Sequence, residues 1–370
     1  MRMFARMPSL ETMGIQTFFC GPESFTPDGR PYLGPAPELK GLFLATGMNS
    51  NGILNSGGTG LTMAEWMIDG WPSRSMGPLL ATRAHPFQAN TRYNQERAAE
   101  SVGFHYGLAW AGRQVNSARG VRRVPLHREL EDAGAVMAER IGWEVPMYFD
   151  KDNPKWSDEP SLKWKPWSAK VKDECLAARD AAVILDQSMY AKIMVQGPDA
   201  VHALNHICGA QMDVDVGVSI YTQFLNQKGG IEADVTVTRI APQSFMVVTG
   251  HPSQMRDQHW IKTHADPSWR FEVFDATSAY CLLTLHGPNS RKILQSLTTD
   301  DLSNEAFPFG AARLMDVAHA RGWVIRRSFL GELGFEMMFP TEFSVGVYEP
   351  LLDAGKPHGL QHMGMFAMNA

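Results

Sequence analysis

The chain has 370 residues, of which 44% are hydrophobic and 20% are charged, which is an ordinary globular composition. This length accommodates about two or three domains, each large enough for its own core. The net charge of -5 and the pI near 6.2 give no electrostatic reason to expect nucleic acid or a membrane surface as a partner.

The sequence contains no evident targeting signal and no two cysteines at motif spacing. No apolar run reaches the roughly 18 residues that a membrane-spanning helix needs, and the N-terminal residues lack the apolar centre of a secretory signal. The cysteines are too far apart for a CxxC motif, so we predict buried thiols in a reducing compartment, either the cytoplasm or the mitochondrial matrix. They are Cys20, Cys175, Cys208 and Cys281.

A strand, a glycine-rich loop and a helix are predicted near the N-terminus. The turn formers of residues 26–31 predict a tight reversal, and the apolar run 42–46 predicts a buried strand. The small polar loop 47–52 leads into a helix expected over 53–70. A helix start can offer backbone N–H groups to an anionic ligand, but these residues equally favour a loop that merely requires small side chains. The apolar residues at helical spacing are Leu61, Ala64, Met67 and Ile68.

The helix signal stops at residues 70–75, which we interpret as a domain boundary. Beyond it, helices are predicted over 90–102 and 125–139. The segment 149–167 is rich in Pro, Lys, Asp and Trp, and this composition predicts a surface connection. The histidines of this region have no partner at metal-ligand spacing, so we predict no metal site; they are His85, His105 and His127.

The second half of the chain contains an internal repeat. Residues 192–199 run from an apolar strand through Gly-Pro-Asp into an amphipathic helix over 200–208, and residues 282–289 run through Gly-Pro-Asn into a helix over 290–297. Pro at the first helical position loses no hydrogen bond. The repeat predicts a duplicated α+β domain, and sites in such domains often lie between the two halves.

A β-hairpin is predicted between the two copies. The runs 221–225 and 231–239 are joined by Asn-Gln-Lys-Gly-Gly, and side-chain alternation places Glu232, Asp234, Thr236 and Thr238 on its polar face. From this pattern alone, Asp234 is better explained as a solvated strand carboxylate than as a catalytic group.

The N-terminal motifs resemble a known family. Residues 21–29 (GPESFTPDG) with 47–52 (GMNSNG) are similar to the closing segment of the flavin domain in the sarcosine dehydrogenase and dimethylglycine dehydrogenase family. The resemblance implies that Gly47, Asn49, Ser50, Gly52 and Ile53 lie beside the flavin ring. The G-x-G-x-x-G fingerprint of dinucleotide binding does not occur in the chain, nor does the histidine that carries covalent flavin in this family. We therefore expect that the chain alone does not hold FAD tightly.

The C-terminal motifs resemble the tetrahydrofolate-binding domain that glycine-cleavage T-protein shares with these dehydrogenases. The resemblance rests on the hairpin, the Gly-Pro repeats, residues 300–308 and the motif 331–336 (GELGFE). It implies that Asp234 assists methylene capture near folate N10, with Tyr221 opening the hairpin. Glu336 is the first choice, and Glu332 the second, for the carboxylate that binds the pterin. Phe329 and Gly250 depart from the T-protein pattern, and Gly250 favours the dehydrogenase branch.

These observations predict a multidomain α+β protein. We expect residues 1–75 to be the C-terminal remnant of an FAD-dependent oxidoreductase domain and 76–147 a middle module and linker. Residues 148–370 are expected to form a T-protein-like folate domain that is incomplete at its C-terminus. The resemblance implies an FAD-dependent enzyme that demethylates sarcosine or dimethylglycine and passes the one-carbon unit to tetrahydrofolate.

Three alternatives remain open from the sequence. The chain could act as a stand-alone folate-dependent aminomethyltransferase without flavin. It could be an interaction subunit completed by a separate FAD-domain polypeptide or an electron-transfer partner. It could also be a non-catalytic remnant.

Overall fold

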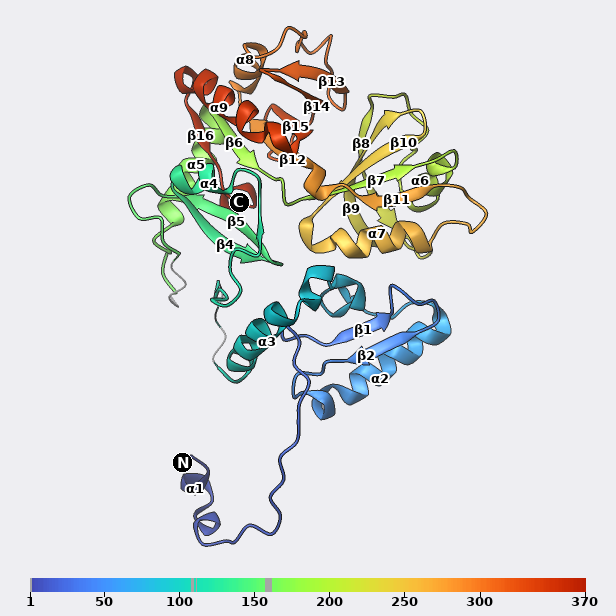
Figure 1. Ribbon diagram of the computed structural model, residues 1–370, viewed down its shortest axis with the longest axis vertical. Coiled ribbons are helices and arrows are strands. Elements are labelled where there is room, and N and C mark those ends of the chain that lie inside the picture. Colours follow the sequence, from blue (N-terminus) through green and yellow to red (C-terminus); the bar gives the residue numbers. More distant parts are fainter. Residues whose placement is uncertain (1, 108–109, 111, 157–161) are drawn as a thin grey trace.

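The computed structural model describes residues 2–107, 110, 112–156 and 162–370. The N-terminal residues extend away from the rest of the chain and carry α1 (Arg2–Arg6) (Figure 1). They lead into an antiparallel pair, β1 (Tyr32–Pro35) and β2 (Phe43–Thr46), followed by α2 (Gly52–Asp69). The predicted turn, strand and helix of this region are therefore confirmed, but the predicted burial of the strand is wrong, because every residue of β2 is partly or fully exposed.

The buried face of helix α2 is not the face that carries its regularly spaced apolar residues. The apolar residues at helical spacing are all exposed, whereas Thr62 and Met63 are buried. Met63 joins Leu33 and Met76 in a small cluster, with Trp66 packed beside it. Because β1 and β2 form a sheet of only two strands, they cover one side of α2, and its more apolar side stays open.

The middle of the chain is a helix followed by a three-stranded sheet. Helix α3 (Thr91–Tyr106) confirms the predicted helix there. The prediction of a helix over 125–139 is confirmed for α4 (His127–Asp132) but is wrong for the second half, which forms the strand β4 (Ala135–Arg140). Gly134, at φ +92°, stops the helix, and the residues after it pair with β5 (Trp143–Phe149), which also pairs with β3 (Arg122–Arg123).

A five-stranded sheet follows, in the order β11-β7-β10-β9-β8. Its strands are β7 (Ala191–Gln196), β8 (Ser219–Leu225), β9 (Ile231–Ala241), β10 (Ser244–Thr249) and β11 (Glu272–Asp275). Helices α6 (Ala200–Ile207) and α7 (Gln254–Thr263) pack on one face, where Ile193, Val235 and Val247 are buried.

A six-stranded sheet is arranged in the order β13-β14-β15-β12-β6-β16. Its strands are β6 (Ala182–Asp186), β12 (Tyr280–His286), β13 (Ala312–Val317), β14 (Ala320–Arg326), β15 (Gly334–Pro340) and β16 (Leu360–His362). The helices associated with it are α5 (Ser168–Asp180), α8 (Ser290–Gln295), α9 (Ser344–Gly355) and α10 (Met365–Met368).

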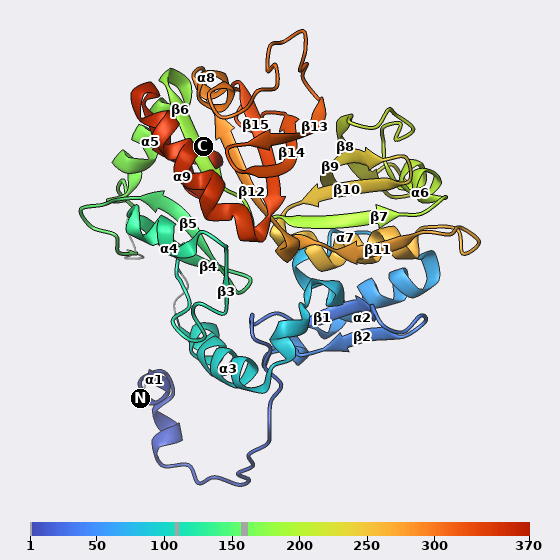
Figure 2. The ribbon, with the colours of Figure 1, turned by 45° about the horizontal axis from the view of Figure 1, so that its top comes forward.

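The internal repeat is confirmed, and its two copies lie in different sheets. The first copy is β7 with α6, and the second is β12 with α8. Gly197 and Gly287 of the two Gly-Pro pairs have φ values of +140° and +110°, and a Cβ at either would meet a backbone oxygen at 2.5 Å or 2.7 Å. The two sheets lie side by side in Figure 2, and a cluster that includes Met194, Met246, Ile325 and Met338 packs between them. The predicted α+β fold is confirmed.

Candidate functional site between the two sheets

Glu336 points into the space between the two sheets. It pairs with Thr284 and Ile325 on the neighbouring strands, so it shares a face with Ile325 and Met338 of the intersheet cluster. Protein atoms enclose the carboxyl group, although part of the residue remains accessible to water. This burial raises the pKa of Glu336 to about 7, against a smaller lowering effect of the Arg327 charge. No hydrogen bond to its carboxylate forms within the described part of the chain.

Other buried polar groups around Glu336 also lack partners. Among the described residues, no group pairs with Thr284 Oγ1, His286 Nδ1 or Arg327 Nε. Arg327 Nη2 donates to Ser219 Oγ at 3.0 Å, and Thr238 Oγ1 donates to the same hydroxyl at 2.9 Å, so this network joins the two sheets. Buried polar groups are normally paired, and a group of unpaired ones indicates a position for a polar ligand.

Asp234 and Tyr221 lie at the outer end of the same face. Asp234 pairs with Gln223 and Thr236 pairs with Tyr221, so all four side chains are on one side of the sheet. The Tyr221 hydroxyl donates to the Asp234 carboxylate, and this hydrogen bond raises the pKa of Tyr221. Along β9, Thr238 is fully buried, Thr236 is half-buried and Asp234 is exposed. At about 3.3 Å per residue, Asp234 lies about 13 Å along the strand from the Thr238 level.

Asn226 holds the hairpin that presents Asp234. Its Oδ1 accepts hydrogen bonds from Gly230 N at 2.8 Å and Lys228 N at 3.0 Å, while its Nδ2 donates to Glu232 at 2.7 Å. The predicted hairpin is confirmed as β8 and β9, with Ala233, Val235 and Val237 on the core side. Asp234 is therefore carried by an ordered turn rather than by a loose loop.

Glu332 lies away from this face. It pairs with Arg179 at 2.7 Å and lines a cavity of about 540 Å³ together with Cys175, Phe329 and Met368. Of the two glutamates that the sequence offers for the pterin, only Glu336 points between the sheets.

The loop after β2 is strained and tied down from within the protein. Asn49 and Ser50 have φ values of +50° and +65°, a conformation that costs such residues about 1 to 3 kcal/mol each. Asn49 is buried, and its Oδ1 accepts from Thr26 N at 2.9 Å. Ser50 Oγ donates to Glu23 at 2.7 Å and accepts from the Tyr106 hydroxyl at 2.8 Å. The side chains of Asn49 and Ser50 are thus engaged by the protein.

Of the other predicted flavin-side residues, Gly47 is buried, Gly52 is partly buried and Ile53 is exposed. Gly47 has a φ of +67°, Gly52 begins α2 without a side-chain cap from Asn51, and Ile53 is 95% exposed. The loop therefore presents backbone groups and Ile53, rather than polar side chains, to a ligand beside it.

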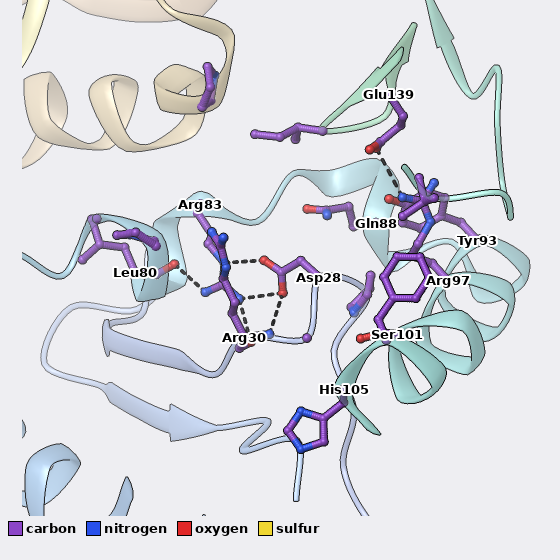
Figure 3. Close-up of a pocket in the computed structure, with 18 of the residues that line it drawn as sticks. Asp28, Arg30, Leu80, Arg83, Gln88, Tyr93, Arg97, Ser101, His105 and Glu139 are labelled. Carbon is purple, nitrogen blue, oxygen red and sulfur yellow. Dashed lines mark hydrogen bonds and ion pairs between the residues drawn. The ribbon is translucent and has the colours of Figure 1, made fainter. Parts of the chain in front are cut away.

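A cavity of about 710 Å³ lies between the flavin-side segment, α3 and the start of α7 (Figure 3). Two ion pairs lie in its lining: Arg83 binds Asp28 at 2.7 Å, and Arg97 lies 3.4 Å from Glu139. None of the residues predicted for the site lines it. We therefore place the candidate site at the intersheet face and not in this cavity.

Sequence reasoning missed the residues that complete the intersheet face, which are Ser219, Thr284 and Arg327. The available signal for Arg327 was its position at the end of an apolar strand, where alternation places it on the same side as Ile325. These residues lie on β8, on β12 and directly after β14, and only the packing of the sheets brings them toward Glu336.

Comparison with known proteins identifies this domain. The family model described as GCVT N-terminal domain matches residues 126–370. The chain belongs to this family. The model described as FAD dependent oxidoreductase matches residues 1–66 of this GCVT-domain protein. Among solved structures, it is similar to the glycine cleavage system aminomethyltransferase T from Bartonella henselae, with a TM-score of 0.55 and 25% identity, covering 67% of this chain and 61% of that one.

Curated relatives of this GCVT-domain protein include two mitochondrial dehydrogenases. Mitochondrial sarcosine dehydrogenase from Mus musculus is 34% identical over 99% of the chain, and mitochondrial dimethylglycine dehydrogenase from Homo sapiens is 30% identical over 98%. The alignments cover 44% and 42% of those proteins, so the chain spans less than half of their length. Its domain content is that of the sarcosine and dimethylglycine dehydrogenase family, whose cofactors are FAD and a folate.

Proposed function

We propose that the chain is the folate-binding part, with a segment of the flavin domain, of an FAD-dependent N-methylglycine dehydrogenase. The enzyme oxidises an N-methyl group of sarcosine or dimethylglycine, and the folate domain captures the one-carbon unit. One observation carries this proposal: the enclosed carboxylate of Glu336 on one sheet faces the other sheet, whose intersheet side carries Thr238 and, at its outer end, the exposed Tyr221–Asp234 pair. The free thiols of the described cysteines agree with a reducing compartment, the cytoplasm or the mitochondrial matrix.

The chemistry of the residues fits tetrahydrofolate. An enclosed carboxylate with unused acceptor capacity binds the adjacent N–H donors of a flat heterocycle. The face from Thr238 to Asp234 then receives the rest of the molecule, so that its N10 region approaches Asp234. Asp234 accepts the proton that the folate amine loses when it attacks the iminium carbon, and Tyr221 orients the carboxylate by its hydrogen bond.

The flavin side of the chain supplies part of a second site. FAD, when bound, takes up the hydride from the methylated amine. In our proposal Gly47, Gly52 and Ile53 border the flavin ring, while Asn49 and Ser50 hold the shape of the loop through their bonds to Thr26 and Glu23. The contribution of this chain is therefore to shape the loop beside the cofactor.

Titration of the 370-residue chain with tetrahydrofolate tests the folate site. Glu336→Ala is expected to weaken binding at least about tenfold, because a charged hydrogen bond contributes about 1.5 to 3 kcal/mol. Asp234→Ala is expected to leave the dissociation constant within about threefold, because an exposed carboxylate adds little binding energy. Equal binding by wild type and Glu336→Ala would overturn the assignment.

A coupling assay tests Asp234 in a full-length, flavin-loaded relative that carries the substitutions at the positions matching this chain. Asp234→Ala should leave flavin reduction by sarcosine intact but release formaldehyde in place of methylene-tetrahydrofolate, because the iminium is no longer captured. Asp316→Ala, which removes an exposed strand aspartate of β13, is the matched control and should keep the product unchanged. An unchanged yield of methylene-tetrahydrofolate in Asp234→Ala would contradict the role of Asp234.

A second candidate is an interaction role completed by another polypeptide. The open apolar face of α2 favours it, because Ile53, Leu54 and Ile68 are each more than four-fifths exposed. In this reading a separate FAD-domain chain or an electron-transfer partner covers α2. Co-purification of the chain with flavin absorbance on addition of such a domain would support it.

A stand-alone aminomethyltransferase is the third candidate, favoured by the similarity of fold to aminomethyltransferase T. It requires folate binding with no yellow chromophore and no stimulation by an added flavin domain. A chain that binds no folate at all would instead be a non-catalytic remnant.

A further inference from the structure

Arg327 leaves most of its hydrogen-bonding capacity unused although it is only 6% exposed. Its Nη2 donates to Ser219 Oγ at 3.0 Å, and its Nε has no partner among the described residues. The backbone N–H of Arg327 donates to Gly334 O at 3.2 Å, which continues the ladder between β14 and β15 by one residue. Alternation then places its side chain on the same face as Ile325 and Glu336.

Arg327 and Glu336 attract each other without forming an ion pair. Each charge stabilises the charged form of the other, yet no salt bridge joins them within the described part of the chain. Two buried charges that remain apart lose their hydration without gaining a direct contact. Such a cost is expected where a ligand fits between the two groups and hydrogen-bonds to both.

The pterin edge has the complementary pattern. It presents an exocyclic amino group, a ring N–H and an oxo group at position 4, which are donor, donor and acceptor. Resting on the proposed folate function, we propose that Glu336 accepts the two donors while Arg327 donates to the oxo group. Arg327 is thus a specificity-determining residue that selects 4-oxo over 4-amino pterins.

The experiment compares two ligands on the 370-residue chain. Calorimetry under anaerobic conditions measures the dissociation constants of tetrahydrofolate and of its 4-amino-4-deoxy counterpart, in which a donor replaces the oxo acceptor. Wild type is expected to prefer tetrahydrofolate by about 10- to 100-fold, because the 4-amino group would face the guanidinium donors and leave them unpaired. In Arg327→Met the preference should fall at least about threefold without vanishing, because the mismatch at position 4 is gone while the 4-amino compound still lacks the ring N–H at position 3 that Glu336 accepts.

Arg326→Met is the matched control. Arg326 is the neighbouring residue, and its Nη1 donates to Asn304 Oδ1 and to Phe307 O at 3.0 Å, so it should leave the preference as in wild type. If Arg327→Met does not fold, Arg327→Lys replaces the planar fork by a single ammonium and should lower the preference at least about threefold.

The outcomes separate this inference from the proposed function. A smaller preference in Arg327→Met but not in Arg326→Met supports the role of Arg327. A preference as large as that of wild type in the folded Arg327 variants overturns that role while the folate function stands. A wild-type chain that binds neither pterin overturns both.

Discussion

The enclosed carboxyl group of Glu336 links folding to pH. Burial raises its pKa from the ordinary 4.5 to about 7, so between these values the folded protein holds a proton that the unfolded chain has released. Stability from this group is complete below pH 4.5 and is lost as the pH rises through 7. The loss amounts to at most about 3 kcal/mol, at 1.36 kcal/mol per pKa unit.

Glu336→Gln should remove this pH dependence. The amide keeps the shape of the side chain but does not titrate, so the free energy of unfolding should fall less between pH 4.5 and 8 than in wild type. Urea unfolding at both pH values measures the difference. Glu174, whose pKa burial also raises to about 7, is present in both proteins, so its contribution cancels. An identical decline in both proteins would contradict the enclosed state of Glu336.

Single residues of the site differ in how far sequence predicts them. Asp234 and Glu336 stand in motifs that carry the family resemblance, and the alternation of strand residues already placed Asp234 on a polar face. Arg327 lies in no such motif. Its partner Ser219 is 108 residues away, and only the packing of two sheets brings the two together.

Elements with a strong local signal were predicted well, and those decided by tertiary pairing were not. The repeat and the hairpin carry their own turn residues, Gly-Pro and Gly-Gly, and both are confirmed. Residues 135–139 lack such a local signal. They follow Gly134 and become a strand because β5 offers them a partner.

The packing of α2 on β1 depends on one glycine. Gly34 has a φ of +103°, and a Cβ there would lie 2.6 Å from the ring of Trp66 on α2. Gly34→Ala should therefore lower the opening free energy of the α2 amides by about 2 to 5 kcal/mol, through the left-handed backbone and the overlap together. Hydrogen exchange followed by mass spectrometry measures it.

Gly41 provides the control for that prediction. Its φ is +85°, but no atom lies within 4 Å of the position of a Cβ. Gly41→Ala should cost only the backbone term, about 1 to 2 kcal/mol. Equal effects of the two substitutions would show that the Trp66 contact contributes nothing.

At the scale of the whole molecule, the N-terminal part of the chain contacts the region of the five-stranded sheet. The short helix Ala81–Arg83 packs against α7, and in the flavin-side segment (residues 1–75) the Trp71 ring centroid lies 4.6 Å from Lys228 Nζ. Figure 2 shows α7 directly above the β1–β2 pair and α2. Lys228 belongs to the turn of the hairpin that carries Asp234, so the proposed folate site and the flavin-side segment are in physical contact.

The open face of α2 is an exposed apolar surface of this segment. At about 100° per residue, Ile53, Leu61, Ala64, Met67 and Ile68 fall on one side of the helix, opposite the buried Thr62, and the buried Met63 lies at the edge of this side next to Met67. Sequence correctly indicated an apolar stripe. It could not indicate that the two-stranded sheet packs against the other side of α2.

This surface should make the isolated chain self-associate. Exposed apolar stripes are covered by whatever apolar surface is available, and in the absence of a flavin domain that is a second copy. Leu61→Lys combined with Ile68→Glu should shift the chain toward the monomer in sedimentation velocity, because it places charges in the centre of the stripe. Leu314→Lys on β13 is the control, because Leu314 is 47% exposed but lies away from α2. It should leave the proportions of monomer and associated chain unchanged. If both variants associate as wild type does, α2 is not the contact, and the proposed role of this face as the seat of a flavin domain loses its structural basis.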